Sequence, residues 1–391
     1  MTFVPLTAGV PARDRLETGG LLALLGLVAA LQLSIAVSQI LLSAAVLCWL
    51  ASHVWHRERV DPPAFAWPLM AYAALTLLSA GFSGNPAISI GDCKQLVLFL
   101  LVPLTYEFAR GARARVVVTV LLTIAAASAI IGIVQYGILN YDNLGRRTQG
   151  TLSHWMTYAG TLMLMITAAV ARLLYDTRDR MWAVMIMPAL VVSLALTLTR
   201  SAWVGTAAGV GVLLLSKDFR LLAVLPVALV TVFAVAPGQL TSRVYSIVDL
   251  HDETNRDRLA MLEAGTSIVR DHPLTGVGPD MVERVYPDYR VPYAVKPTNP
   301  HLHNVPMQIA AERGLPALAA WVWFVVSLIR GLLQLIAKRR NITLAAGGLG
   351  AVAAMLVAGM FEYNFGDSEF LMLFLVLVTL PFAADRERVL P

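Results

Sequence analysis

Charged side chains are scarce in this sequence, and cysteine is almost absent from it. Only 14% of the residues are Asp, Glu, Lys or Arg, whereas 58% are hydrophobic and the mean hydropathy is +0.69. Because soluble domains carry about 25% charged residues, this composition excludes a soluble protein and predicts a polytopic membrane protein. Two cysteines, Cys48 and Cys93, make no disulfide framework. The small net charge of +5 gives no reason to expect a nucleic-acid partner.

Apolar runs of the length needed to cross a bilayer, about 17 to 25 residues, recur along the chain. They predict a single all-α membrane domain, 1–391, with nine transmembrane helices in 20–237 and three in 315–385. Between them lies a polar loop, 238–314. Basic residues precede the first run, but no cleavage site follows it, so we expect this run to remain as a span. The twelve predicted spans are 20–36, 38–55, 64–81, 94–109, 116–139, 156–175, 181–199, 201–216, 221–237, 315–337, 343–361 and 370–385.

Lys and Arg are distributed unequally between the two sides that this count defines. If the N-terminus is cytoplasmic, the inside segments hold 18 of the 30 basic residues and the short outside loops hold only 4. The other 8 lie in the loop 238–314, which is too long to follow the positive-inside rule. The bias predicts cytoplasmic N- and C-termini and an outward-facing loop.

The long loop is expected to be folded, because so many residues without structure are unusual. Within 256–270, helical spacing places Leu259, Leu262, Thr266 and Val269 on one face. We expect this helix to lie on the bundle or at the membrane surface. The sequence DHPLTGVGPD then ends it.

Three arginines of the short outside loops stand against the charge bias of their side. Arg146 and Arg147 lie in the loop NYDNLGRRTQGTLSHW, and Arg200 stands at the end of two apolar spans, between spans seven and eight, where charge is costly. Such side chains either snorkel to lipid phosphate or bind a phosphorylated ligand. The residues alone leave both interpretations open.

A histidine precedes a short predicted helix just before span ten. Asn304 suits the N-cap, Pro306 suits the first turn, and Gly314 with Pro316 ends the helix. The positive end of a helix disfavours imidazolium, and a neutral imidazole is what a general base requires. His303 is therefore a candidate base, and a capping or interface histidine is the alternative.

The residues from His303 onward resemble a signature of bacterial O-antigen ligases and of the related O-antigen polymerases and protein O-oligosaccharyltransferases. The shared pattern is His303-Asn304, nine residues and Gly314. The family usually has Gly, Thr or Tyr three residues further on, where this chain has Ala317, and this departure puts a packing role in doubt but not the histidine.

Three other segments are similar to the same family in order and sidedness. RTQG resembles its Arg-x-x-Gly, and LTRSAWVG resembles its outward arginine between spans seven and eight. RLAMLEAGTSIVRDHPLTGVG, which begins at Arg258, resembles a block that ends in His-Pro-Leu-x-Gly-x-Gly, with Leu262 where Trp is common. The resemblance covers essentially the whole chain.

The resemblance implies a GT-C-like glycosyltransferase of the bacterial inner membrane with a periplasmic active site in the loop 238–314. Such ligases lie among membrane lipids and transfer a polysaccharide from undecaprenyl diphosphate to a sugar hydroxyl of lipid A–core. His303 would be the base, in an inverting displacement. The predicted substrate-binding residues are Arg147, Arg200, Arg258, Asn304 and His301, of which the arginines would bind the diphosphate.

No metal or cofactor is expected. The outside loops contain no Asp-x-Asp pair, and their His, Asp and Glu residues show no metal-ligand spacing, so arginines would replace a divalent cation. Glu362 and Asp367 are expected to contact acceptor hydroxyls or to be solvated. The remaining candidates are weaker. Gly276 and Gly278 would let the backbone approach a phosphate, but a turn explains them better, and the tyrosines at 286, 289 and 293 would stack on sugars or equally belong to an interfacial belt.

Several functions fit the sequence. An O-antigen polymerase or a protein O-oligosaccharyltransferase would use a similar donor, although the chain ends soon after span twelve, which favours a lipid acceptor. A secondary transporter or lipid flippase also suits twelve spans. Transporters place polar groups at the bilayer midplane, whereas these span interiors are nearly free of charge. A scaffold would not need outward-facing arginines.

Overall fold

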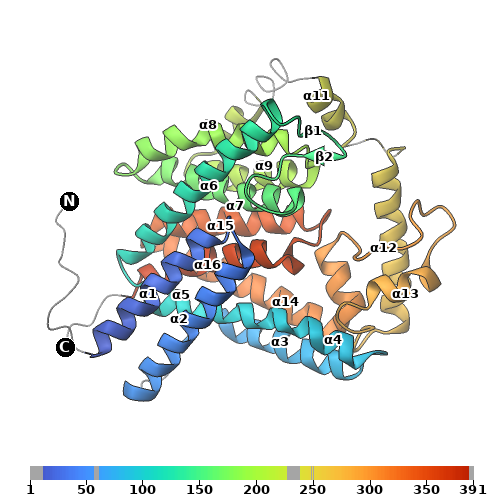
Figure 1. The fold of residues 1–391 in the computed structure, drawn as a ribbon, viewed down its shortest axis with the longest axis horizontal. Helices are drawn as coiled ribbons and strands as arrows, with labels where there is room; N and C mark the ends of the chain where they lie inside the picture. Colours follow the sequence, from blue (N-terminus) through green and yellow to red (C-terminus); the bar gives the residue numbers. More distant parts are fainter. Residues whose placement is uncertain (1–11, 57–60, 227–237, 248, 250, 387–391) are drawn as a thin grey trace.

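The chain is almost entirely helical in the computed structural model, which describes residues 12–56, 61–226, 238–247, 249 and 251–386 (Figure 1). The elements before the long loop are α1 (Ala12–Ala30), α2 (Ile35–His56), α3 (Ala66–Gly81), α4 (Pro86–Asp92), the 3₁₀ helix η1 (Cys93–Leu100), α5 (Leu101–Phe108), α6 (Arg113–Gly137), β1 (Asp142–Asn143), β2 (Arg146–Arg147), α7 (Trp155–Tyr175), α8 (Arg180–Leu196), α9 (Arg200–Lys217) and η2 (Phe219–Ala223). From the loop onward they are α11 (Gly238–Tyr245), α12 (Glu253–Asp271), α13 (Val282–Tyr289), α14 (Val305–Ala337), α15 (Ile342–Ala358), η3 (Asn364–Gly366) and α16 (Ser368–Ala384).

Several of these helices have the length and composition of membrane spans, which supports the predicted all-α membrane protein. Within the described ranges, five helical segments are long and apolar enough to cross a bilayer: Ile35–Trp55, Pro86–Phe108, Arg113–Gly137, Trp155–Tyr175 and Val305–Ala337. α3, α8, α15 and α16 are shorter apolar helices. Twelve crossings remain a prediction. The ninth predicted span, 221–237, falls largely on 227–237, outside the described residues.

The fourth predicted span, 94–109, starts too late. The helical run begins at Pro86, after Asn85 caps it with its side chain, and it continues through η1 into α5. Proline suits a first helical turn because its missing N–H would be unpaired there. The sequence concealed this start because charged residues flank Cys93 and interrupt the apolar run.

The centre of the bundle is formed by α7, α15 and α16, most of whose side chains are buried. α9 packs along α15, and glycine makes their contact close. A Cβ atom added to Gly209 would lie 2.7 Å from the Gly350 carbonyl oxygen. This packing fixes the start of α9, where Arg200 stands, near the turn that follows α15 and carries Glu362.

The long loop is folded, as predicted, and contains α11, α12 and α13. α12 and α13 lie together at the right of Figure 1, and α11 lies at the top, near β1 and β2. A small apolar core joins α12 and α13 to the first turns of α14, and Met261, Ile268, Val282, Tyr286 and Ala311 are among its buried residues. The loop is thus a packed cap on one end of the bundle.

The predicted apolar face of α12 is not the face that this helix buries, and its position at the membrane surface stays a prediction. Leu259 and Thr266 are exposed, whereas small residues such as Ala260, Ala264 and Gly265 face α14. A Cβ atom added to Gly265 would lie 2.7 Å from a Met307 side-chain atom. Close packing places these small residues, together with Met261 and Ile268, on the buried face, and Leu259 is left exposed.

The short helix before span ten ends where the sequence predicted. Gly314 has φ 80° and ψ 169° and separates the first turns of α14 from its long apolar part. A Cβ atom there would lie 2.2 Å from the Leu274 carbonyl oxygen. Ala317, which departs from the family pattern, is fully buried three residues later.

Candidate active site

The loop before α14 is tied to the end of α15 by hydrogen bonds. The Asn304 side chain accepts a bond from an amide of the first turn of α14 over 2.9 Å, which confirms the predicted N-cap, and it donates to the Met360 carbonyl over 3.1 Å. The Val305 amide donates to the Gly359 carbonyl over 2.7 Å. His303, with φ 48°, is thereby held beside the turn after α15.

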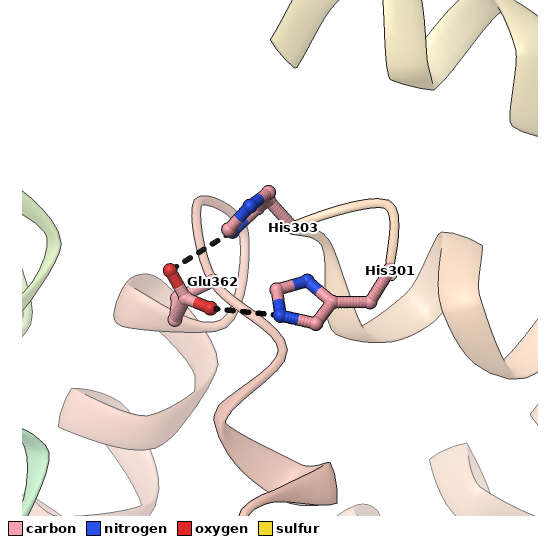
Figure 2. Close-up of side chains that lie close together, drawn as sticks. All are labelled: His301, His303 and Glu362. Atoms are coloured by element: carbon pink, nitrogen blue, oxygen red, sulfur yellow. Dashed lines mark hydrogen bonds and ion pairs between the residues drawn. The ribbon is translucent and has the colours of Figure 1, made fainter. Parts of the chain in front are cut away.

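Two histidines of this loop face one carboxylate (Figure 2). His303 Nδ1 lies 3.0 Å from Glu362 Oε2, within hydrogen-bond distance, and His301 Nε2 lies 3.8 Å from Glu362 Oε1. The two imidazole rings meet edge to face with centroids 4.2 Å apart. A carboxylate at Nδ1 favours the tautomer with its proton there, which leaves the Nε2 lone pair of His303 able to accept a proton.

Burial and neighbouring charges lower the pKa values of the two groups beside His303, the His301 imidazole and the Glu362 carboxyl. Burial, reinforced by His303 and opposed by Glu362, lowers the pKa of His301 to about 4. Burial alone would raise the pKa of Glu362, but the two histidines and Arg258 outweigh it and lower that pKa to about 2. Near neutral pH the site therefore holds an ionised carboxylate next to a neutral His301.

Glu362 is a member of the cluster that sequence reasoning did not pair with the histidines. It was expected to be solvated or to contact an acceptor, yet its side chain is only 15% exposed and contacts both histidines. The sequence showed no metal-ligand spacing, yet ligand atoms of His301, His303 and Glu362 lie within 4.8 Å of one another in the structure. Glu362 follows His303 by 59 residues, so no local spacing could reveal the cluster.

A cationic cavity of about 270 Å³ ends at His303. It brings together the three arginines predicted from separate motifs, which come from β2, from the start of α9 and from α12. It also contains two cations that no motif had indicated, one from α11 and one from the segment before α14. The basic residues that line it are Arg147, Arg200, Arg243, Arg258 and Lys296.

Arg200 has a structural partner as well as a place in the cavity. Only 5% of its side chain is exposed, and it donates to Asp252 Oδ1 over 3.1 Å and to the Ser246 hydroxyl over 2.9 Å. Asp252 also caps α12. Arg200 therefore ties the start of α9 to the loop, and part of its charge is neutralised.

The other three arginines of the cavity form no salt bridge within the described residues. Arg147 donates to the Leu144 carbonyl over 3.3 Å and lies over the Trp155 ring at 5.2 Å, and the buried Nε of Arg258 has no hydrogen-bond partner there. Burial lowers the pKa of Arg147 and Arg258, and burial with the charges of neighbouring arginines lowers that of Arg243 to about 10. Clustered, partly desolvated guanidinium groups are stabilised by a bound anion.

Two acidic residues, Glu253 and Asp257, also line the cationic cavity. Asp257 is 4% exposed, and its Oδ1 accepts hydrogen bonds from the Val295 and Lys296 amides over 3.1 and 3.2 Å. It holds this segment in place through backbone donors, and no arginine side chain of the described residues bonds to it. Asp257 therefore forms no ion pair with the arginines, and the basic residues of the cavity outnumber its acidic ones.

Two further cavities adjoin the imidazole–carboxylate cluster. One, of about 210 Å³, is lined by His301, Glu362, Thr157 and Asp367 together with apolar side chains. The other, of about 180 Å³, has apolar walls that include Leu259, and it reaches His303. The exposed face of α12 thus borders the site instead of the bundle.

Other predicted candidates lie away from the cluster. Tyr286 is fully buried in the loop core, so its proposed interfacial or sugar-stacking position is wrong. The hydroxyls of Tyr289 and Tyr293 donate to Asp271 and Glu263 over 3.0 and 2.6 Å. These tyrosines brace the loop.

The two glycines of GVGPD have a packing role. Gly276 and Gly278 have φ of 64° and 107°, and the Gly278 amide donates to the Glu312 carbonyl over 2.9 Å. A Cβ atom on Gly276 would lie 2.2 Å from the Glu312 backbone. They let the loop contact the first turns of α14, in keeping with the turn interpretation.

The fold and the site define a class: a multi-pass helical membrane protein in which a cationic cavity meets an imidazole–carboxylate pair. Residues 183–322, from α8 into the apolar part of α14, are similar to the family model described as O-antigen ligase. The matched segment contains Arg200, Arg258 and His303, whereas Arg147 and Glu362 lie outside it. No curated protein matches the chain.

Proposed function

We propose that the protein is an inverting, metal-independent glycosyltransferase that moves O-antigen polysaccharide from undecaprenyl diphosphate to a sugar hydroxyl of lipid A–core, on the periplasmic side of the inner membrane. One observation carries this proposal. Arg147, Arg200 and Arg258, which come from three separate segments, line one cavity that ends at His303.

The cavity suits the leaving group of such a donor. A diphosphate carries several negative charges, and guanidinium groups bind phosphate oxygens through charge-assisted hydrogen bonds. Arg147, Arg243 and Arg258 form no salt bridge among the described residues, so their charge remains largely available to a ligand. They would stabilise the charge that develops as the bond between the anomeric carbon and the diphosphate oxygen breaks.

His303 completes the displacement. The acceptor hydroxyl oxygen attacks the anomeric carbon, and its proton passes to His303 Nε2. The bonding pair of the broken C–O bond leaves with the diphosphate, and a single displacement inverts the anomeric centre. Glu362 is a positioning residue, since it holds His303 through Nδ1 and stabilises the imidazolium that forms.

Reconstitution tests this function. The purified protein would be supplied with an undecaprenyl-diphosphate-linked glycan and lipid A–core in the presence of a chelator. We expect product from the wild type, none from His303→Ala, and wild-type product from the control His251→Ala, whose side chain is fully exposed. A strict requirement for a divalent cation, or full activity of a folded His303→Ala variant, would contradict the mechanism.

The acceptor is tested in the same system. Lipid A–core, a second lipid-linked glycan and an acceptor peptide would be offered separately. Growth of the lipid-linked glycan would identify a polymerase, and glycosylation of the peptide would identify a protein O-oligosaccharyltransferase. Either result in the absence of lipid A–core product would replace the proposed acceptor while retaining the donor chemistry.

Cysteine labelling tests the side of the membrane. In a variant without Cys48 and Cys93, the exposed Leu144 and Val295 would each be replaced by cysteine. We expect both to react with an impermeant maleimide added to intact spheroplasts, while a cysteine at Lys338, on the opposite predicted side, stays protected. Labelling at only one of positions 144 and 295 would place Arg147 and His303 on opposite sides of the membrane and contradict a shared site.

A further inference from the structure

The cluster at the end of the cationic cavity has a feature that the proposed transfer does not use. His301 forms no hydrogen bond within the described residues: its buried Nδ1 has no partner, and its Nε2 lies 3.8 Å from Glu362 Oε1, too far for one. The His301 side chain is 28% exposed, and the ring lines the cavity beside Glu362. Neutral imidazole with a free lone pair is a ligand for transition metals.

The three side chains have the geometry of a metal-binding group. One atom each of His301, His303 and Glu362 lies within 4.8 Å of the others, and the separations across the carboxylate are 3.0 and 3.8 Å. Zinc binds nitrogen and oxygen at about 2.0 to 2.2 Å, so tetrahedral ligands stand roughly 3.3 Å apart. Small side-chain rotations therefore suffice to close the three around one ion.

We propose that His301, His303 and Glu362 form a site for a single borderline transition ion such as Zn²⁺, and that its binding blocks the reaction. The ligand set, two imidazoles and one carboxylate, suits zinc, nickel or copper and not magnesium or calcium, which prefer oxygen ligands. The inhibitory part rests on the proposed role of His303 as the base. The binding part stands independently of it.

The ion would inhibit the transfer reaction because of the His303 nitrogen to which it binds. The ion would replace the proton between His303 Nδ1 and Glu362, because that nitrogen is the one that faces the carboxylate. A neutral imidazole with a metal at Nδ1 carries its proton on Nε2. The nitrogen that should accept the acceptor's proton is then already protonated, and Glu362 is no longer available to stabilise an imidazolium.

The surroundings limit the affinity. Arg258 and Lys296 line the adjoining cavity and oppose a second positive charge. The cluster also provides three protein ligands and leaves a fourth position open, unlike the four-ligand sites that hold structural zinc. We therefore expect reversible binding that a chelator removes.

Cobalt binding tests the site without any glycan. Co²⁺ added to the chelator-treated, purified protein should give visible d–d absorption that saturates at one ion per chain and that Zn²⁺ displaces. His301→Ala and the milder His301→Gln should weaken binding at least about tenfold, since even outer-shell changes cost about 10- to 100-fold in metal affinity. The exposed-histidine control His251→Ala should bind as the wild type does.

Activity then tests the consequence. Each variant's rate in Zn²⁺ would be compared with its own rate in chelator, so that a lowered basal rate of His301→Gln does not matter. We expect zinc but not Mg²⁺ to inhibit the wild type, chelator to restore it, and the inhibition constant of His301→Gln to rise at least about tenfold, in step with its binding.

The outcomes are separable from those of the transfer reaction. Absence of saturable cobalt binding, or binding that both His301 variants leave unchanged, overturns the site even if the protein is an active ligase. Binding with zinc activation overturns the inhibition. If no transfer is detected at all, the cobalt measurement still decides whether the metal site exists.

Discussion

Glu362 provides the sharpest test of how the site works, because the structure gives the atom that it contacts, His303 Nδ1. In Glu362→Gln the amide oxygen can still accept the hydrogen bond from His303 Nδ1, but the negative charge is lost. The change therefore isolates the electrostatic part of the contact. The cationic cavity, which binds the donor in the proposed mechanism, keeps all of its arginines.

The magnitude follows from the 3.0 Å separation of His303 Nδ1 and Glu362 Oε2. An ion pair at that distance is worth up to about 5 kcal/mol at an effective dielectric constant of about 20. Only part of this is lost, because the imidazolium is incompletely formed in the transition state and the amide still accepts a bond. A loss of about 2 to 4 kcal/mol lowers kcat roughly 30- to 1,000-fold at about 1.4 kcal/mol per factor of ten.

The assay is steady-state transfer with chelator present, with kcat and the donor KM measured separately. We expect kcat to fall while the donor KM stays within about threefold of wild type, since only transition-state stabilisation is removed. Glu283→Gln, at an exposed position on α13, is the matched control and should leave both constants unchanged. A folded Glu362→Gln variant with wild-type kcat would refute the role of the carboxylate, and an equal change in KM would indicate that it binds the donor.

Two further results are expected. Burial and the charges of Arg200 and Arg147 lower the folded-state pKa of Arg243 to about 10, so its charge destabilises the empty protein fully below about pH 10, and this penalty declines as the pH rises from there towards the higher pKa of the unfolded chain. Arg243→Gln should thus melt at a higher temperature than wild type at pH 7.5 but gain less from added pyrophosphate in a thermal-shift assay, and equal gains would place the anion elsewhere. Gly314→Ala should lower the melting temperature, because φ is 80° and an added Cβ atom would lie 2.2 Å from the Leu274 carbonyl oxygen. Backbone strain alone should cost about 1 to 3 kcal/mol. Gly91→Ala, where an added Cβ atom has nothing within 4 Å, is the control, and equal melting temperatures of the two variants would contradict the account of the kink.

Much of the fold followed from local signals. Apolar runs of bilayer length identified helices, because backbone groups in lipid must bond within their own segment. The N-cap at Asn304 and the break at Gly314 were predictable for a similar reason, since both depend on neighbours within a few residues. The fourth span was misplaced at its start because hydropathy does not register a helix that begins among polar residues.

The sequence by itself also identified four of the charged or ionisable residues of the site. Arg147, Arg200, Arg258 and His303 were identified from motifs and from their cost at span ends, and the structure brings them to one cavity. The two faces of α12 were not predictable in this way. Which side of that helix is buried depends on how closely α14 approaches, and Gly265 allows an approach that residue hydrophobicity does not encode.

Only the tertiary structure decided the partner of the base. Glu362 follows α15 and His303 precedes α14, and hydrogen bonds between those two turns, with the close packing of α9 on α15, set their distance. No spacing along the chain carries that information, because residues 59 positions apart meet only after the helices have packed. The imidazole of His303 and the guanidinium groups of the three arginines could be identified from the sequence, whereas the packing of the helices places the Glu362 carboxylate beside that imidazole.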